Sequence, residues 1–180
     1  MTETTTARPR PYRPPPATTV HPLPPGKSAP TGERAGRCPY IRAGVDAEPG
    51  PAPTVADIEG DRVGRVTLLA GYRPVGCRFY FAYPRYEAVA DILPTTFATS
   101  AQARNAMVRT AQAGRQAQTY PNFVPGVTGI SYRTTFFGPD GDQDWAFVFA
   151  KGRVMVVVHT QQTRSSSNAR YLAAAVAGKF

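Results

Sequence analysis

Proline is the residue that most constrains how this chain can fold. Nine of its 19 prolines lie in residues 1–36, which also hold many threonines and almost no large apolar side chains. Such a segment cannot bury enough apolar surface to offset the entropy lost on ordering, so we predict a disordered tail or linker. The remaining residues, 37–180, are predicted to form a single domain, because about 144 residues bury roughly two-thirds of their unfolded surface.

Within this domain, the apolar residues alternate as they do in strands. The sequence predicts strands over residues 64–72 and 77–83, joined by a short hairpin connection. Three more strands are predicted over residues 130–137, 144–150 and 153–160, and a Lys-Gly turn joins the last two. The final strand is apolar on both sides, which is typical of a central strand covered on both faces.

Two helices are predicted from caps and from a 3.6-residue periodicity. The first is capped by Ser100 and ends near Ala113, and the second begins at Ser166 or Ser167. Their apolar stripes consist of Ala103, Ala106, Met107, Thr110 and Ala111, and of Ala169, Leu172, Ala173, Val176 and Phe180. The expected fold class is therefore α+β, with a mainly antiparallel sheet of five or more strands and two helices packed against it.

Two stretches are predicted to lack regular structure. Residues 40–58 contain three prolines, and residues 120–127 contain two prolines and a glycine, so the latter are predicted to form a loop. Asp57, Glu59 and Asp61 lie in a turn-like stretch and do not form a carboxylate pair suited to acid–base catalysis.

Net charge and hydropathy limit where the chain can act. Its 21 Lys and Arg outnumber its 12 Asp and Glu, which gives a net charge of +9. No apolar run approaches the roughly 18 residues of a membrane-spanning helix. The first 13 residues lack the apolar stretch of a signal peptide, and no lipidation cysteine lies near the start. We therefore expect a protein that is either cytoplasmic or exported by a segment that precedes Met1.

Two apparent ligand-binding motifs do not fit their templates. Gly26-Lys27-Ser28 resembles the end of a phosphate-binding loop, but a histidine replaces the first glycine of that motif and prolines flank the sequence. The run from Asp140 to Asp144 resembles a calcium loop, but the positions that require Gly and Glu hold Trp and Lys. A plain turn at Asp140-Gly141 is the better interpretation. We predict no metal site and no cofactor.

The sequence favours no enzyme class. His21 lies in the tail, and His159 ends a predicted buried strand, where a structural role is the default. Because a thiolate nucleophile needs a nearby base, a pair of Cys77 or Cys38 with His159 is the remaining enzymatic alternative. No residue is predicted to be catalytic.

Arginines alternate with aromatic residues near the second predicted strand. The candidate binding surface consists of Arg78, Tyr80, Arg85 and Tyr86. Such side chains together stack on and neutralise single-stranded nucleic acid, which makes a basic nucleic-acid-binding module the second hypothesis. An ordinary strand in which Phe79, Phe81 and Tyr83 face the core explains the same residues and is favoured.

The two cysteines carry the most specific structural prediction. Cys38 begins the predicted folded region and Cys77 begins the second predicted strand, on the side of Phe79 and Phe81. A bond between them would close a loop of about 40 residues, worth roughly 4 kcal/mol in the chain-entropy relation. The alternative is two free thiols packed as small core residues. We predict the Cys38–Cys77 disulfide, which would place the domain outside the cytoplasm.

Several short motifs resemble a known family. They are Arg37-Cys38-Pro39-Tyr40, Gly64-Arg65-Val66, Cys77 before Phe79-Tyr80, Ala150-Lys151-Gly152 before Val156-Val157-Val158, and Ala169-Arg170. Over residues 37–178 the chain resembles the actinobacterial domain of unknown function numbered twenty-twenty. The resemblance implies exported, often lipid-anchored envelope proteins in which the two cysteines are paired, and it implies no activity. This chain departs from that pattern because it lacks the export signal and the lipidation cysteine.

These observations favour a non-enzymatic, extracytoplasmic domain of the cell envelope that binds or scaffolds a partner or ligand. The proline-rich spacer would let such a domain stand away from a membrane or wall. The expected partner is an envelope protein or ligand, and nucleic acid is the less favoured one. The alternative localisation is the cytoplasm.

Overall fold

The computed structural model describes residues 32–44, 53–82, 89–137, 143–163 and 166–180. The predicted tail, apart from residues 32–36, lies outside the described residues, so its disorder stays a prediction. Arg85, Tyr86 and the predicted turn at Asp140-Gly141 also lie outside them.

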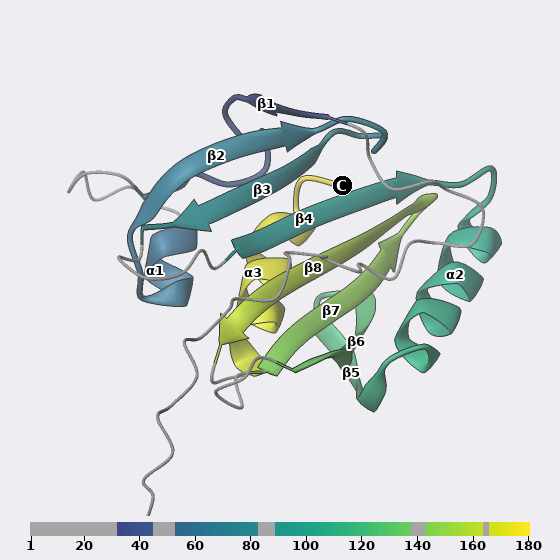
Figure 1. Ribbon diagram of the computed structural model, residues 1–180. Coiled ribbons are helices and arrows are strands. Elements are labelled where there is room, and N and C mark those ends of the chain that lie inside the picture. Colours follow the sequence, from purple (N-terminus) through teal and green to yellow (C-terminus); the bar gives the residue numbers. More distant parts are fainter. Residues whose placement is uncertain (1–31, 45–52, 83–88, 138–142, 164–165) are drawn as a thin grey trace, which may run out of the picture.

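The described residues form one eight-stranded sheet and three helices (Figure 1). The strands are β1 (Glu33–Ala35), β2 (Val63–Leu69), β3 (Gly76–Phe81), β4 (Val89–Thr96), β5 (Arg115–Val124), β6 (Val127–Phe137), β7 (Gln143–Lys151) and β8 (Val154–Thr163). The helices are α1 (Val55–Glu59), α2 (Ser100–Gln112) and α3 (Ser166–Ala177). The α+β class and the antiparallel sheet are confirmed, although the structure has three more strands than the five named in the prediction and one more helix.

Two antiparallel meanders lie side by side in this sheet. The strand order is β1-β2-β3-β4-β8-β7-β6-β5, and every neighbouring pair is antiparallel. The first four strands and the last four each follow chain order, and β4 pairs with β8 to join the two groups. Helix α2 carries the chain from β4 in the centre to β5 at the far edge (Figure 1).

The helices cover both faces of the sheet. Helices α1 and α3 pack on one face, which we call the disulfide face because it also holds Cys77. Helix α2 packs on the other, the α2 face, through Ala106 and Met107. Figure 1 shows α3 behind the sheet. Because β8 is apolar towards both layers, its residues Met155 to Val158 are at most 4% exposed, as predicted for a central strand.

The periodicity of the helices predicts their buried sides correctly. All five residues of the predicted α2 stripe are buried, and so are the four stripe residues that lie within α3. The cap of α2 differs by one residue, because the side chain of Thr99 accepts the N–H of Gln102 at 3.1 Å while Ser100 is the first helical residue. Phe180 lies beyond the end of α3 and packs against the core.

Strand β4 is the main element that the sequence analysis does not assign. It contains Asp91 and Pro94, residue types that are rare inside central strands. Asp91 is tolerated there because Arg78 of the neighbouring strand binds its carboxylate through two hydrogen bonds of 2.7 and 3.1 Å. A contact between distant residues therefore overrides the local propensity.

The two edge strands correct two further predictions. Strand β1 lies inside the segment predicted to be a disordered tail, so the folded region begins before residue 37. Strand β5 includes most of residues 120–127, which were predicted to be a loop. Pro121 fits because β5 is an edge strand that pairs only with β6, and the register shifts between Tyr120 and Val124.

Helix α1 lies in the stretch predicted to be irregular. Its N-terminus is a capping box, in which the Thr54 side chain accepts the N–H of Asp57 and the Asp57 carboxylate accepts the N–H of Thr54. Gly60 ends the helix in the left-handed conformation. Both signals are present in the sequence but are outweighed by the neighbouring prolines.

Candidate functional site

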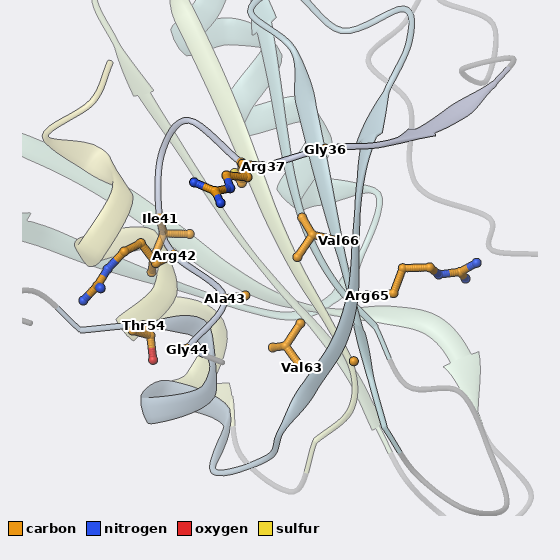
Figure 2. Close-up of a pocket in the computed structure, with 12 residues that line it drawn as sticks. Gly36, Arg37, Ile41, Arg42, Ala43, Gly44, Thr54, Val63, Arg65 and Val66 are labelled. Atoms are coloured by element: carbon orange, nitrogen blue, oxygen red, sulfur yellow. The ribbon is translucent and has the colours of Figure 1, made fainter. Parts of the chain in front are cut away.

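A pocket of about 510 Å³ lies beside the disulfide, between β2 and the irregular residues 36–44, which we call the bridging segment (Figure 2). Its lining comprises Gly36, Arg37, Cys38, Ile41, Arg42, Ala43, Gly44, Thr54, Val63, Gly64, Arg65 and Val66. The volume falls within the range of about 300–1,000 Å³ typical of small-molecule sites. The bridging segment therefore forms one wall of the pocket and β2 forms the other.

The disulfide fixes one end of that wall. Cys38 and Cys77 are bonded, with Cα atoms 5.6 Å apart, so the predicted pairing is confirmed. Cys77 is fully buried on β3, on the same face as Phe79 and Phe81, as its position in the strand predicts. The bond thus attaches an irregular segment to β3, the third strand from the β1 edge of the sheet.

Other contacts hold the bridging segment along its length. The hydroxyl of Tyr40 donates to the carbonyl of Val75 at 2.7 Å, and the Tyr40 ring lies 4.6 Å from that of Phe180. Burial raises the pKa of Tyr40 to about 12, so its hydroxyl stays a donor at neutral pH. Towards α1, the N–H of Val55 donates to the carbonyl of Arg42 at 3.0 Å. The wall of the pocket is therefore anchored by several elements at once.

A glycine closes the end of the pocket. Gly44 has a φ of 81° in the left-handed region, and a Cβ there would collide with the Thr54 hydroxyl. Its backbone can therefore approach the cap of α1 in a way that other residues would not allow. The pocket ends where the bridging segment meets α1.

The floor of the pocket is apolar and its opening is basic. Figure 2 shows Val63 and Val66 extending from β2 towards the bridging segment, while Arg65 extends to the opposite side. Ile41 is 8% exposed and Val63 only 1%. Arg37 and Arg42 are exposed on the bridging segment. The pocket therefore offers apolar contact below and positive charge near its edge.

The opposite face of the same strands holds a row of charged residues. The charged row comprises Glu33, Arg78, Asp91, His159 and Asp144, contributed by β1, β3, β4, β8 and β7. Arg78 lies opposite Asp91 in the sheet register, and Asp91 lies opposite His159. The register therefore places the side chains on one face, where neighbours across strands can pair.

Arg78 is the centre of this row. Its guanidinium binds Asp91 at 2.7 Å and Glu33 at 2.9 Å, and its side chain is only 14% exposed. Burial opposes the charge of Arg78, but hydrogen bonds and attraction from Asp91 outweigh it and raise the pKa of the guanidinium. Tyr80 donates to Glu33 at 2.6 Å, and Arg65 stacks on the Tyr80 ring at 3.8 Å. Arg78 and Tyr80, the two predicted binding residues that the structure describes, thus contact carboxylates of the chain itself.

His159 lies between two carboxylates. Its Nδ1 is 3.7 Å from Asp91, its Nε2 is 3.7 Å from Asp144, and its side chain is 5% exposed. It lies on the α2 face, next in sequence to Val158 of the disulfide face. The Cys–His nucleophile considered above is ruled out for this structure, because both sulfurs are in the disulfide.

Parts of both regions are predictable from the sequence. The disulfide, Arg78 and Tyr80 are named above, and Asp144 and His159 are named in other roles, whereas the pocket, Glu33 and Asp91 are not. A signal for the pocket was present, because a disulfide at Cys38 must bring Arg37 and Ile41 next to the strands around Cys77. A signal for the row was present too, because Asp91 is the one charged residue in the apolar run Val89–Leu93.

Two further observations concern the described residues as a whole. Within the described ranges, no group of three or more His, Cys, Asp or Glu side chains is arranged to hold a metal ion. None of the helices that the structure describes has the length and hydropathy needed to cross a bilayer.

Comparison of the chain with protein-family models and with curated proteins found no match.

Proposed function

We propose that the chain is a non-enzymatic binding domain of the cell envelope, acting in an oxidising compartment outside the cytoplasm, with the pocket beside the disulfide as its ligand site. The observation that carries the proposal is the position of the disulfide. The Cys38–Cys77 bond both requires oxidising conditions to persist and holds one wall of the pocket.

The sequence resemblance supports the same function. The motifs around Cys38, Cys77 and Lys151 resemble a family of exported envelope proteins without assigned activity. A binding domain needs a preformed pocket and a rigid wall, and the bridging segment has such a wall through its anchors to Val75, Phe180 and α1.

The charged row gives less support to nucleic-acid binding. A guanidinium that neutralises phosphate must be accessible, whereas Arg78 is mostly buried and binds Asp91 and Glu33. The proposed ligand site is therefore the pocket, and the row has a structural role.

The compartment is tested by the oxidation state of the protein in its native host. Cells are lysed in denaturant with a thiol-reactive polyethylene glycol, with and without prior reduction. We expect no mass tag on the unreduced full chain and two tags after reduction. Two tags without reduction would overturn the extracytoplasmic assignment.

The ligand site is tested by methyl NMR of the full chain against fractions of the native envelope, divided into lipid extract and solubilised glycan. We expect shifts at Ile41, Val63 and Val66, which line the pocket. Val108, 40% exposed on α2, is the control methyl group. Shifts at Val108 alone, or none with any fraction, would overturn the assignment of the pocket.

A further inference from the structure

We infer that the pocket beside the disulfide takes a single-chain anionic amphiphile, with its hydrocarbon chain on the apolar floor and its carboxylate or phosphate group at Arg37 and Arg42. This inference rests on the proposed function and names the class of ligand. It comes from the combination of an apolar floor with two exposed arginines in the same lining.

The floor is suited to hydrocarbon. Ile41, Ala43, Val63 and Val66 line it with aliphatic side chains. Tyr40 belongs to the same hydrophobic cluster, but its ring packs on Phe180 and its hydroxyl is bonded to Val75. The pocket walls therefore offer an extended chain aliphatic contact and little competition from aromatic stacking.

Thr54, the uncharged polar side chain of the lining, is already hydrogen-bonded within the chain. The hydroxyl of Thr54 donates to the Asp57 carboxylate at 2.7 Å and accepts the N–H of Asp57. Thr54 is therefore committed to the cap of α1. Polar contact with a ligand is therefore left to the two exposed arginines and the backbone of the lining, while the side chains of the floor are aliphatic.

The opening is suited to an anion. Arg37 and Arg42 are exposed and line the pocket, and Figure 2 shows the Arg42 side chain extending from the bridging segment away from β2. Arg42 is close enough to Asp57 to lower the pKa of that carboxyl, after the larger effect of its hydrogen bonds to Thr54. Asp57 therefore offsets part of the charge of Arg42, and Arg37 is expected to contribute the greater share of binding.

The size of the pocket limits the length of the ligand. A volume of 510 Å³ corresponds to roughly 17 water-sized groups at about 30 Å³ each. A headgroup and about 8–12 carbons therefore fit, because a methylene is close to that size. A two-chain phospholipid would need to leave one chain outside.

The experiment uses the full, oxidised chain and radiolabelled decanoate as the probe, which stays within the length that the pocket volume allows. Competitors are dodecanoate, dodecyl phosphate, dodecanol and inorganic phosphate. We expect dodecanoate and dodecyl phosphate to displace the probe, dodecanol to bind roughly tenfold more weakly, and inorganic phosphate not to compete. The two anionic competitors distinguish a fatty acid from a phosphate-bearing lipid.

Chain length provides an independent measure. Affinity should rise roughly two- to fourfold for each methylene added between octanoate and dodecanoate, and then stop rising. Competition by dodecanol equal to that of dodecanoate, or affinity independent of chain length, would overturn the inference.

Three variants locate the site. Arg37→Gln with Arg42→Gln should remove the preference for dodecanoate over dodecanol, and Val66→Trp should occupy the floor and abolish binding of both. Arg104→Gln with Arg109→Gln removes the same two charges from the exposed side of α2 and is the matched control. If Val66→Trp does not fold, the arginine pair and the competitors still decide the question.

The result also separates this inference from the proposed function. Methyl shifts in the pocket with the glycan fraction, but no binding of the probe, would overturn the amphiphile and leave the binding domain in place. Absence of shifts with every fraction would overturn both.

Discussion

The two faces of β3 are stabilised by different kinds of interaction. On the disulfide face, Cys77, Phe79 and Phe81 are at most 5% exposed and belong to the hydrophobic cluster that also includes α3. On the α2 face, Arg78 and Tyr80 join the charged row. A single six-residue strand thus belongs to a covalently anchored apolar core on one side and to an ionic network on the other.

Two carboxylates illustrate what this difference means. Asp91, on the α2 face, is fully buried and is bound by Arg78 through two hydrogen bonds. Glu59, near the disulfide face, receives one hydrogen bond from Asn168 at 3.1 Å, and its other oxygen is buried with no partner among the described residues. Burial raises the pKa of Glu59 to about 7, against the lowering effect of Asn168. A buried carboxylate is therefore compensated by a cation on one face and only by an amide on the other.

The largest expected effect comes from removing the central carboxylate of the charged row. Asp91→Ala removes the carboxylate that binds Arg78 through two hydrogen bonds and also takes a carboxylate from His159, and loss of one partner of a buried pair typically costs about 3–5 kcal/mol. Urea unfolding measures the free energy. Glu33→Gln, at the 34% exposed end of the row, is the control and should cost about 1 kcal/mol or less. Equal losses for the two variants would contradict a cooperative row.

The next effect concerns the covalent anchor. Cys38 and Cys77 are 39 residues apart, and removing such a crosslink is expected to cost roughly 2–4 kcal/mol because the unfolded chain regains freedom. Cys38→Ser should show this loss in urea unfolding, and the wild-type chain should show a similar loss when reduced. Loss of the bond should also weaken binding of the amphiphile probe described above, because the bridging segment forms one wall of the pocket. An unchanged midpoint after reduction would contradict the role of the bond.

A third prediction uses pH to test the ionisation of Glu59, the carboxylate that has no cation as its partner among the described residues. The folded pKa of Glu59, about 7, lies above its ordinary value of 4.5, so the folded state holds the proton more tightly. This contribution to stability is fully present below about pH 4.5 and is lost as pH rises through about 7. Glu59→Gln removes that loss, so the variant should be about 1–3 kcal/mol more stable than the wild type at pH 8.

The same comparison contains its own control. Below pH 4.5 the protonated Glu59 and a glutamine are similar, so the difference between the two proteins should nearly disappear. Chemical unfolding at pH 4.5, 6 and 8 measures it. A difference that does not change with pH would show that Glu59 has the same pKa in the folded and unfolded states, and so that burial does not raise it.

Local patterns predict the apolar parts of this fold and miss the compensated polar parts. The stripes of α2 and α3, the hairpin of β7 and β8 and the orientation of Cys77 follow from periodicity, since each is set by the residue's own neighbours. Strand β4 does not follow, because the favourable partner of Asp91 lies on another strand. The pocket does not follow either, since its walls meet only after the disulfide and the sheet have formed.

The smallest change in the free energy of unfolding is expected at Tyr132 on β6, which lies in line with the charged row. Ala146 lies opposite both His159 and Tyr132, so Tyr132 continues the same line of cross-strand neighbours into β6. Its hydroxyl is buried with no hydrogen-bond partner among the described residues, and burial raises the pKa of Tyr132. Tyr132→Phe should therefore stabilise the fold by about 0.5–1 kcal/mol, because an unsatisfied hydroxyl no longer has to be buried. Tyr40→Phe is the matched control and should lose about 1 kcal/mol, since that hydroxyl donates to Val75. A loss of stability in Tyr132→Phe as large as in Tyr40→Phe would mean that the row extends one hydrogen bond further than the described contacts indicate.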